Sequence, residues 1–432
     1  MENLDYLSAT PENPDIEEEK QKRKIAIRDN QLENPRSKTP VMVVPGWGIT
    51  AESFEGVLGH LKDNGLRARA VENLYGVDDE VLTNFFIKLK DARPEIDIDE
   101  IKKKFPKTEL KKAAELIEGL DQIRDGQADA EVNDKGKTDC IGVSQGGYIV
   151  AIAAYLCPER FRNIVLVDPA GIVGKHSRAK LAIRTSKNAR AEQKYADQKK
   201  FQGAELAQQN LKIGAEDMKK VLKENFKEAM LDETGAISKA DITEILKELR
   251  GKGIKIAIIH GVEDKIFPME KVFDLKEKDE GNLGITEGSK PHLDKESADI
   301  FLSTKGTHNQ MGLYLGLWME MVEFALDKLQ NLPDQHEGRF EQYEMLKEAL
   351  DLLRKADHEL QKGTRENLQN AWDLSAQADD ILYSDQIGDD IKIKTMSSND
   401  ALALKAEIDE KIILASELFG LTQESQPSDN SI

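Results

Sequence analysis

The stretch C-I-G-V-S-Q-G-G, residues 140–147, decides the fold of this 432-residue chain. It is typical of the end of a short strand, a tight turn around Ser144 and the start of an apolar helix. Gly142 and Gly146 lie two residues to either side of the serine, where the absence of a Cβ permits a sharp strand-to-helix reversal. Such a turn exposes the serine hydroxyl at the amino end of a helix, where the dipole favours developing negative charge.

Strand-like and helical patterns alternate on both sides of this turn. Apolar, β-branched runs at residues 40–44, 67–71, 163–168 and 254–259 indicate strands, and residues 25–27 and 300–302 add two short candidates. Helical periodicity occurs at residues 51–64, 108–120, 240–249 and 311–329, with Ser238 as the expected cap of the third helix. Residues 76–106 look like a charged, irregular insertion with a possible helix at residues 81–89. We therefore expect an α/β fold with a doubly wound, mostly parallel sheet.

The same patterns divide the chain into six parts. We expect a flexible acidic arm at 1–24, the core at 25–171 and 238–332, a helical lid at 172–237, a helical C-terminal appendage at 333–421 and a flexible tail at 422–432. The lid interrupts the alternation between two strands, so it should lie above their carboxyl ends. The appendage has three helical patterns, at 338–361, 365–383 and 399–419, and it is a candidate surface for a homo-oligomer or a protein partner.

Composition excludes several classes of function. A formal net charge of −19 argues against nucleic acid or an anionic membrane as the main partner. The chain has neither a signal-peptide pattern at Met1 nor an apolar run long enough to span a membrane, so we expect a cytoplasmic protein. Cys140 and Cys157 are expected to be small buried hydrophobes rather than a disulfide or a metal site, and we expect no cofactor.

Two later strand ends carry the groups that a nucleophilic serine needs. A serine hydroxyl requires a base to remove its proton, and a carboxylate holds that base in one tautomer. Asp264 follows the strand at 254–259, and His308 follows the strand near residue 300. Asp168, at the end of the strand at 163–168, is the alternative carboxylate.

Four motifs between Lys38 and Leu329 resemble those of the α/β-hydrolase superfamily: V-V-P-G-W-G, G-V-S-Q-G-G, H-G-V-E-D and G-T-H. The resemblance implies Ser144 as nucleophile, His308 as general base and then acid, and Asp264 as the carboxylate that orients His308. It also implies an oxyanion hole from the backbone N–H groups of Gln145 and Trp47. Pro45 departs from the family, which often has histidine there.

The resemblance leaves the substrate open. The tight turn around Ser144, here called the elbow, is similar to that of carboxylesterases and acyl-protein thioesterases. This similarity implies a small-molecule ester or thioester substrate. Lysophospholipases, peptidases and carbon–carbon bond hydrolases with lids would use the same triad, and a non-catalytic scaffold acting through the C-terminal helices is a further alternative. A basic run in the lid is either a solvated helix face or a site for an anionic head group; its members are Lys175, Arg178, Lys180, Arg184, Lys187 and Arg190.

Overall fold

The structure, a computed structural model, describes most of the chain between residues 25 and 382. The described residues are 25–33, 35–37, 39–71, 74–125, 136–196, 204–261, 263–273, 276–279, 282–284, 292–293, 296–304, 307–309, 315–332, 352–353, 355–362, 364–382, 408 and 411–412. The expected arm at 1–24 and tail at 422–432 lie outside them, as do most of the expected helices at 338–361 and 399–419.

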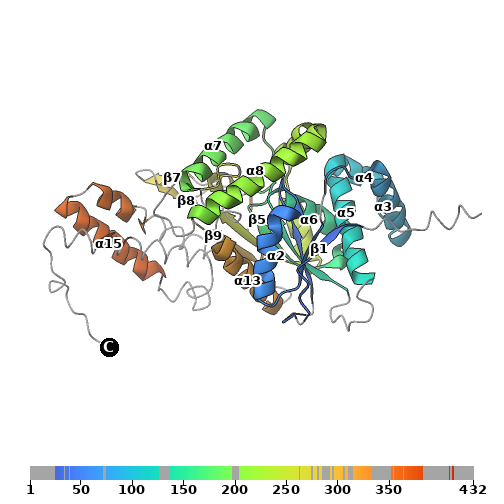
Figure 1. The fold of residues 1–432 in the computed structure, drawn as a ribbon, viewed down its shortest axis with the longest axis horizontal. Helices are drawn as coiled ribbons and strands as arrows, with labels where there is room; N and C mark the ends of the chain where they lie inside the picture. The colour runs from blue at the N-terminus through green and yellow to red at the C-terminus, as the bar shows by residue number, and fades with distance from the viewer. Residues whose placement is uncertain are drawn as a thin grey trace, which may run out of the picture.

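A seven-stranded sheet forms the centre of the molecule (Figure 1). Its strands are β1 (Ile27–Asp29), β2 (Val41–Val44), β3 (Ala68–Val71), β4 (Thr138–Val143), β5 (Phe161–Val167), β6 (Lys255–Gly261) and β9 (Ile300–Thr304). They lie in the order β1-β3-β2-β4-β5-β6-β9, and every neighbouring pair is parallel except β1 with β3. The predicted fold class is therefore confirmed. A separate two-stranded ribbon, β7 (Lys276–Asp279) and β8 (Asn282–Gly284), was not expected.

Helices cover both faces of the sheet. Helices α2 (Glu55–Asp63) and α13 (Leu315–Asn331) lie on one face, and α5 (Lys107–Asp125), α6 (Gln145–Leu156) and α10 (Thr243–Gly251) on the other. Short helical turns lie at η1 (Ala51–Phe54), η2 (Pro158–Arg160) and α11 (Met269–Val272). Alternate side chains of β2 enter opposite cores: Val41 and Val43 pack with α2 and α13, while Met42 and Val44 pack with α5 and α6. Two-sided burial explains why the strands are continuous apolar runs.

Two local expectations were wrong in part. The possible helix at residues 81–89 is present within the longer α3 (Asp79–Ala92), but the rest of residues 76–106 is not simply irregular, because it also forms α4 (Ile98–Lys104). Most apolar side chains of α3 are buried against the core, and this burial stabilises a segment whose many charges face water. The helix expected at 240–249 begins at Thr243, and Ser238 does not cap it. Ser238 lies in the preceding helix, where its hydroxyl donates to the carbonyl of Gly235.

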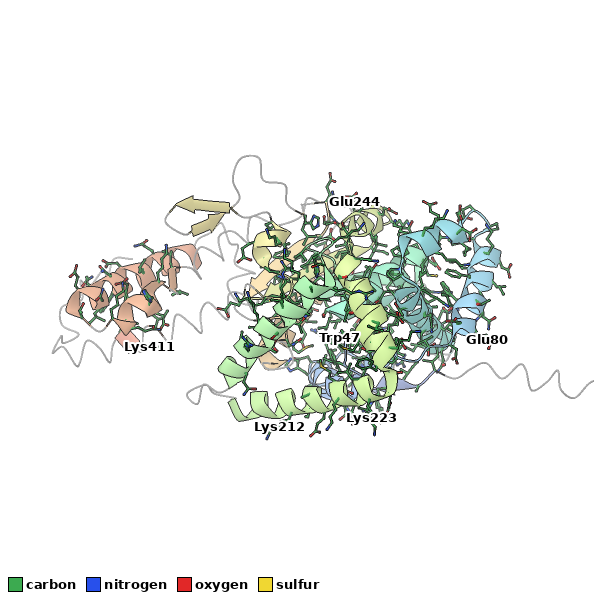
Figure 2. All side chains as sticks on the ribbon, turned by 90° about the horizontal axis from the view of Figure 1, so that it is seen from above. Trp47, Glu80, Lys212, Lys223, Glu244 and Lys411 are labelled. Atoms are coloured by element: carbon green, nitrogen blue, oxygen red, sulfur yellow. The ribbon has the colours of Figure 1, made fainter. Side chains whose placement is uncertain are left out.

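The lid leaves the core after β5 and returns to it before α10. It contains α7 (Arg178–Ala196), α8 (Ala204–Lys227), a π-helical segment η3 (Glu228–Glu233) and α9 (Thr234–Lys239). Figure 1 shows α7 and α8 passing across one end of the sheet. Seen from above in Figure 2, Trp47 lies among these helices, while the exposed Lys212 and Lys223 point outward from α8. The lid therefore covers the strand ends that carry the candidate site.

The C-terminal helical region includes α15 (Arg365–Leu382), which lies at the opposite end of the molecule from α3 and α4 (Figure 1). Leu368, Ala371 and Ala378 on one side of α15 are buried, as expected for a helix that packs on a neighbour. None of the described helices is both long and apolar enough to cross a membrane. Both cysteines are buried free thiols, as expected.

Candidate active site

Ser144 lies at the tight turn between β4 and α6. Its backbone has φ 54° and ψ −118°, a conformation that L-residues rarely adopt and that persists only where the surroundings enforce it. The end of the next strand supplies this support, because the Ser144 amide donates to the Val167 carbonyl and the Ala170 amide donates to the Ser144 carbonyl. A Cβ on Gly146 would lie 2.1 Å from the Val44 carbonyl oxygen, so this position of the elbow requires glycine.

A continuous hydrogen-bonded chain links Ser144, His308 and Asp264. His308 Nε2 lies 2.7 Å from Ser144 Oγ, and His308 Nδ1 lies 2.8 Å from Asp264 Oδ2. The other Asp264 oxygen accepts hydrogen bonds from the amides of Ile266 and Phe267, at 2.6 and 2.9 Å. The structure thus brings together the three side chains that the sequence suggested, in the order that serine activation requires.

The charges around these three side chains favour an ionised Asp264 carboxylate and a basic His308 imidazole. Burial would raise the pKa of the Asp264 carboxyl, but His308 and His260 outweigh burial and hold that pKa below its usual value. Burial would likewise lower the pKa of His308, but the Asp264 carboxylate outweighs it and raises the pKa above the ordinary imidazole value. A raised basicity suits a group that must take the proton of a hydroxyl.

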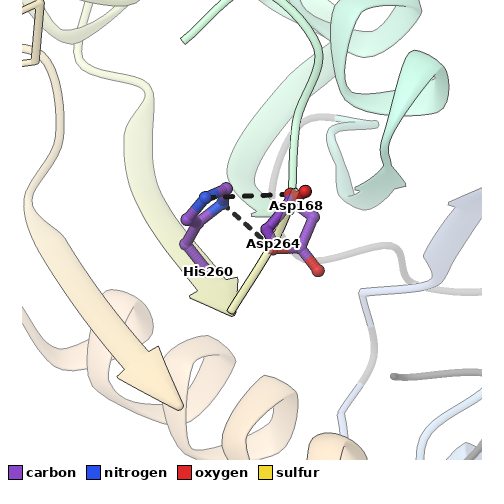
Figure 3. Close-up of side chains that lie close together, drawn as sticks. All are labelled: Asp168, His260 and Asp264. Atoms are coloured by element: carbon purple, nitrogen blue, oxygen red, sulfur yellow. Dashed lines mark ion pairs between the residues drawn. The ribbon is translucent and has the colours of Figure 1, made fainter. Parts of the chain in front are cut away.

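Asp168, the alternative acid, pairs with His260 beside Asp264 (Figure 3). Its Oδ1 lies 3.0 Å from His260 Nδ1 and accepts a hydrogen bond from the Gly261 amide at 2.8 Å. His260 Nε2 lies 2.8 Å from the Phe267 carbonyl oxygen and 3.8 Å from Asp264 Oδ2. His260 is completely buried, and its ring faces both carboxylates without contacting Ser144 or His308 in the hydrogen-bonded chain.

The same three side chains have the composition of a metal site. Ligand atoms of Asp168, His260 and Asp264 all lie within 4.8 Å of one another. Asp264, however, already uses both oxygens for His308 and two backbone amides. A metal ion there would displace the contact to His308, so we interpret the cluster as a hydrogen-bonded network.

The loop after β2 passes directly beside Ser144. A Cβ on Gly46 would lie 3.1 Å from Ser144 Cβ, which places the Gly46–Trp47 peptide close to the serine. The Gly48 amide donates to the Tyr75 hydroxyl at 2.6 Å, and the Trp47 indole donates to the Ala229 carbonyl of the lid at 2.9 Å. These contacts fix the loop, while the backbone N–H groups of Trp47 and Gln145 remain the predicted oxyanion donors.

A buried charged network beside the elbow was missed by sequence reasoning. The Gln145 side chain donates to Glu109 at 3.0 Å, and the buried Lys112 pairs with Glu233 of the lid. The Lys112 ammonium also lies 3.9 Å from the centre of the Tyr75 ring. The available signal was spacing, because positions 109 and 112 share one face of α5. Because charged residues on a helix usually face solvent, this spacing alone does not indicate a buried network.

The basic run of the lid is mostly exposed. Arg184 alone of its six members is partly buried, and its guanidinium donates to the Ile266 carbonyl in the loop that carries Asp264. The other five are exposed, as a solvated helix face requires. Recognition of an anionic head group by them is not needed to explain their positions.

The strand order, the elbow and the chain order serine–aspartate–histidine together specify the fold. The chain has the α/β-hydrolase fold. No family model matches the sequence, and no curated protein is a significant sequence relative.

Solved structures with a similar arrangement include three enzymes of different chemistry. A bromoperoxidase from Bacillus anthracis shares 15% identity over 70% of this chain and 94% of its own, with a TM-score of 0.42. An enol-lactonase from Burkholderia xenovorans LB400 shares 13% identity over 70% and 96%, with a TM-score of 0.43. An esterase from Exiguobacterium antarcticum shares 13% identity over 71% and 96%, with a TM-score of 0.42. At this level of similarity the reaction must be argued from the site itself.

Proposed function

We propose that this protein is a serine hydrolase that cleaves a carboxylic ester or thioester through an acyl-enzyme. The observation that carries the proposal is the unbroken chain from Ser144 Oγ through His308 to Asp264. A role in binding alone would not require a strained serine hydrogen-bonded to a buried, carboxylate-paired histidine.

The proposed reaction follows from the positions of these atoms. His308 Nε2 takes the hydroxyl proton as Ser144 Oγ attacks the carbonyl carbon, and Asp264 stabilises the imidazolium that forms. The protonated His308 then transfers this proton to the leaving alkoxide or thiolate, and an acyl-serine remains. Water, deprotonated by His308, hydrolyses the acyl-serine, and the proton returns to Ser144 Oγ. The amides of Gln145 and Trp47 would hold the oxyanion and contribute on the order of 3 kcal/mol each.

Fluorophosphonate labelling tests the proposal most directly. We expect covalent labelling of the wild type and none of Ser144→Ala. Labelling that does not depend on Ser144 would exclude the proposed chemistry and favour a non-catalytic scaffold that acts through the C-terminal helices.

A substrate panel then distinguishes the members of this class. p-Nitrophenyl esters of increasing acyl length, with an acyl thioester alongside, would give the acyl preference of the wild type. Ser144-dependent labelling without turnover of any of these would point instead to a lysophospholipid, a peptide or a carbon–carbon bond as substrate.

We further propose that the helical region at 333–421 binds another protein or a second copy of this chain. The exposed indole of Trp372 on α15 supports this proposal, since a large apolar side chain in water is typical of contact surfaces.

A further inference from the structure

One stripe of side chains on the lid helix α7 contacts both loops that carry the triad partners of Ser144. The stripe is Arg184, Asn188 and Glu192, spaced four residues apart and therefore on one face of the helix. Asn188 is 1% exposed and Glu192 4% exposed, although most other polar residues of α7 face solvent. Buried polar groups are costly unless they are hydrogen-bonded, so their partners indicate why they are there.

Asn188 bridges the loop that carries Asp264, here called the acid loop, and the loop that carries His308, here called the histidine loop. Its Oδ1 accepts one hydrogen bond from the His308 amide and one from the Lys265 amide, each at 3.3 Å. Lys265 directly follows Asp264, so a single amide oxygen holds the backbone beside both the acid and the base. Arg184 adds a bond to the Ile266 carbonyl, one residue further along the acid loop.

Glu192 holds the rest of the histidine loop. Its carboxylate accepts hydrogen bonds from the Asn309 amide at 3.0 Å, the Asn309 side chain at 3.2 Å and the Thr307 hydroxyl at 3.4 Å. Asn188 Nδ2 also donates to Glu192, so the two lid side chains support each other. The residues on both sides of His308 are therefore bonded to one lid carboxylate.

We infer that Asn188 and Glu192 are positioning residues for the triad: they hold the loops of His308 and Asp264 in register, so the lid helix completes the active site as well as covering it. The contacts themselves are given by the distances above. Their effect on turnover rests on the proposed hydrolase function. Misplacement of a catalytic group by about 1 Å can cost about 100-fold in rate, so two loops held by one helix offer direct control of activity.

Glu192 also acts on the charge of His308. The charged groups that face this imidazole are Asp264, Asp168 and Glu192, and the Glu192 carboxylate helps to raise the pKa of His308. Burial raises the pKa of Glu192 itself, and the hydrogen bonds from Asn309 and Asn188 oppose that rise. Removing the negative charge should therefore move the pKa of His308 downward.

The first test compares variants of the full chain by steady-state kinetics. Asn188→Leu keeps the branched shape of the side chain but removes the acceptor, and we expect kcat to fall about 10- to 100-fold with little change in KM. Ser186→Ala, an exposed position on the same helix, is the matched control and should behave like the wild type. Equal kcat values for the two variants would overturn the inference.

A charge-swapped pair separates positioning from packing. In Asn188→Asp/Glu192→Gln the aspartate can accept from both loop amides and from the new glutamine, and the net charge is retained. The glutamine oxygen can still accept from the Asn309 amide and the Thr307 hydroxyl, while the acceptor for the Asn309 side chain is lost. We expect this double variant to recover most of the kcat lost in either single variant, because the two side chains act as one unit. Additive losses would contradict the inference, and the double variant also carries the test if Asn188→Leu does not fold.

An NMR titration of His308 supplies a measurement that does not depend on turnover. Glu192→Gln should lower the pKa of His308. Asn188→Leu should weaken the low-field NMR resonance of the proton between His308 Nδ1 and Asp264. Unchanged His308 signals in both variants would overturn the inference. If these signals change but the wild type shows no Ser144-dependent labelling, the positioning role stands and the proposed function fails.

Discussion

At the scale of single residues, two aspartates end neighbouring strands and only one contacts His308. We expect Asp264→Asn to lower kcat by about 10⁴-fold, because it removes the carboxylate that selects the imidazole tautomer. Asp168→Asn should cost much less, because the direct contacts of the Asp168 carboxylate are to His260 and the Gly261 amide and not to His308. Steady-state kinetics on a p-nitrophenyl ester would compare the two, and an equal loss would contradict the assignment of the acid.

Glu109 provides a second test at this scale. Burial, with Glu233 adding to it and Lys112 opposing it, raises the pKa of Glu109 from 4.5 to about 7. Between these two values the unfolded chain loses a proton that the folded chain keeps, so Glu109 makes the free energy of unfolding fall as pH rises. At pH 5 this stability is largely present, and above about pH 7 it is lost.

Replacement of Glu109 by glutamine should remove this dependence. Between pH 5 and pH 8, the free energy of unfolding of Glu109→Gln should fall less than that of the wild type. We expect the two changes to differ by on the order of 3 kcal/mol. Urea unfolding at the two pH values measures it. Glu80→Gln on the exposed side of α3 is the control, and a wild-type pH dependence in Glu109→Gln would refute the prediction.

At the scale of elements, the elbow is a junction of β4, α6 and the loop after β2. We expect Gly146→Ala to destabilise the protein by about 3 kcal/mol or more, because its Cβ would meet backbone that has no room to move. Gly59→Ala in α2 is the matched control. No atom lies within 4 Å of the added Cβ there, and the change should stabilise the helix by about 0.5–1 kcal/mol. Equilibrium urea unfolding that shows similar effects for both would contradict the packing argument.

At the scale of the whole molecule, every described strand of the main sheet and all three triad residues precede residue 333. We therefore expect a chain that ends at Leu332 to retain Ser144-dependent labelling and ester hydrolysis. We also expect it to differ from the full chain in oligomeric state or partner binding. Light scattering with size-exclusion chromatography measures the number of subunits. An unchanged number of subunits together with full activity would remove the proposed role of the C-terminal helices.

Periodicity and turn chemistry predicted the sheet well because they are local properties. The run at residues 40–44 is buried on both faces, and the elbow glycines are required by backbone contacts that any sharp strand-to-helix turn creates. The same reasoning found only the middle of α3 and missed α4, because charged side chains obscured the apolar positions that pack on the core.

The sequence by itself determined that Ser144, Asp264 and His308 follow strands of one parallel sheet, because strands that run in parallel end at the same edge. Only the tertiary structure decided which aspartate meets His308, where His260 lies, and that α7 holds the catalytic loops. The bond from Asn188 to His308 joins positions 120 residues apart, and its existence depends on ångström-scale distances between separately folded segments. Local sequence patterns carry no information at that range.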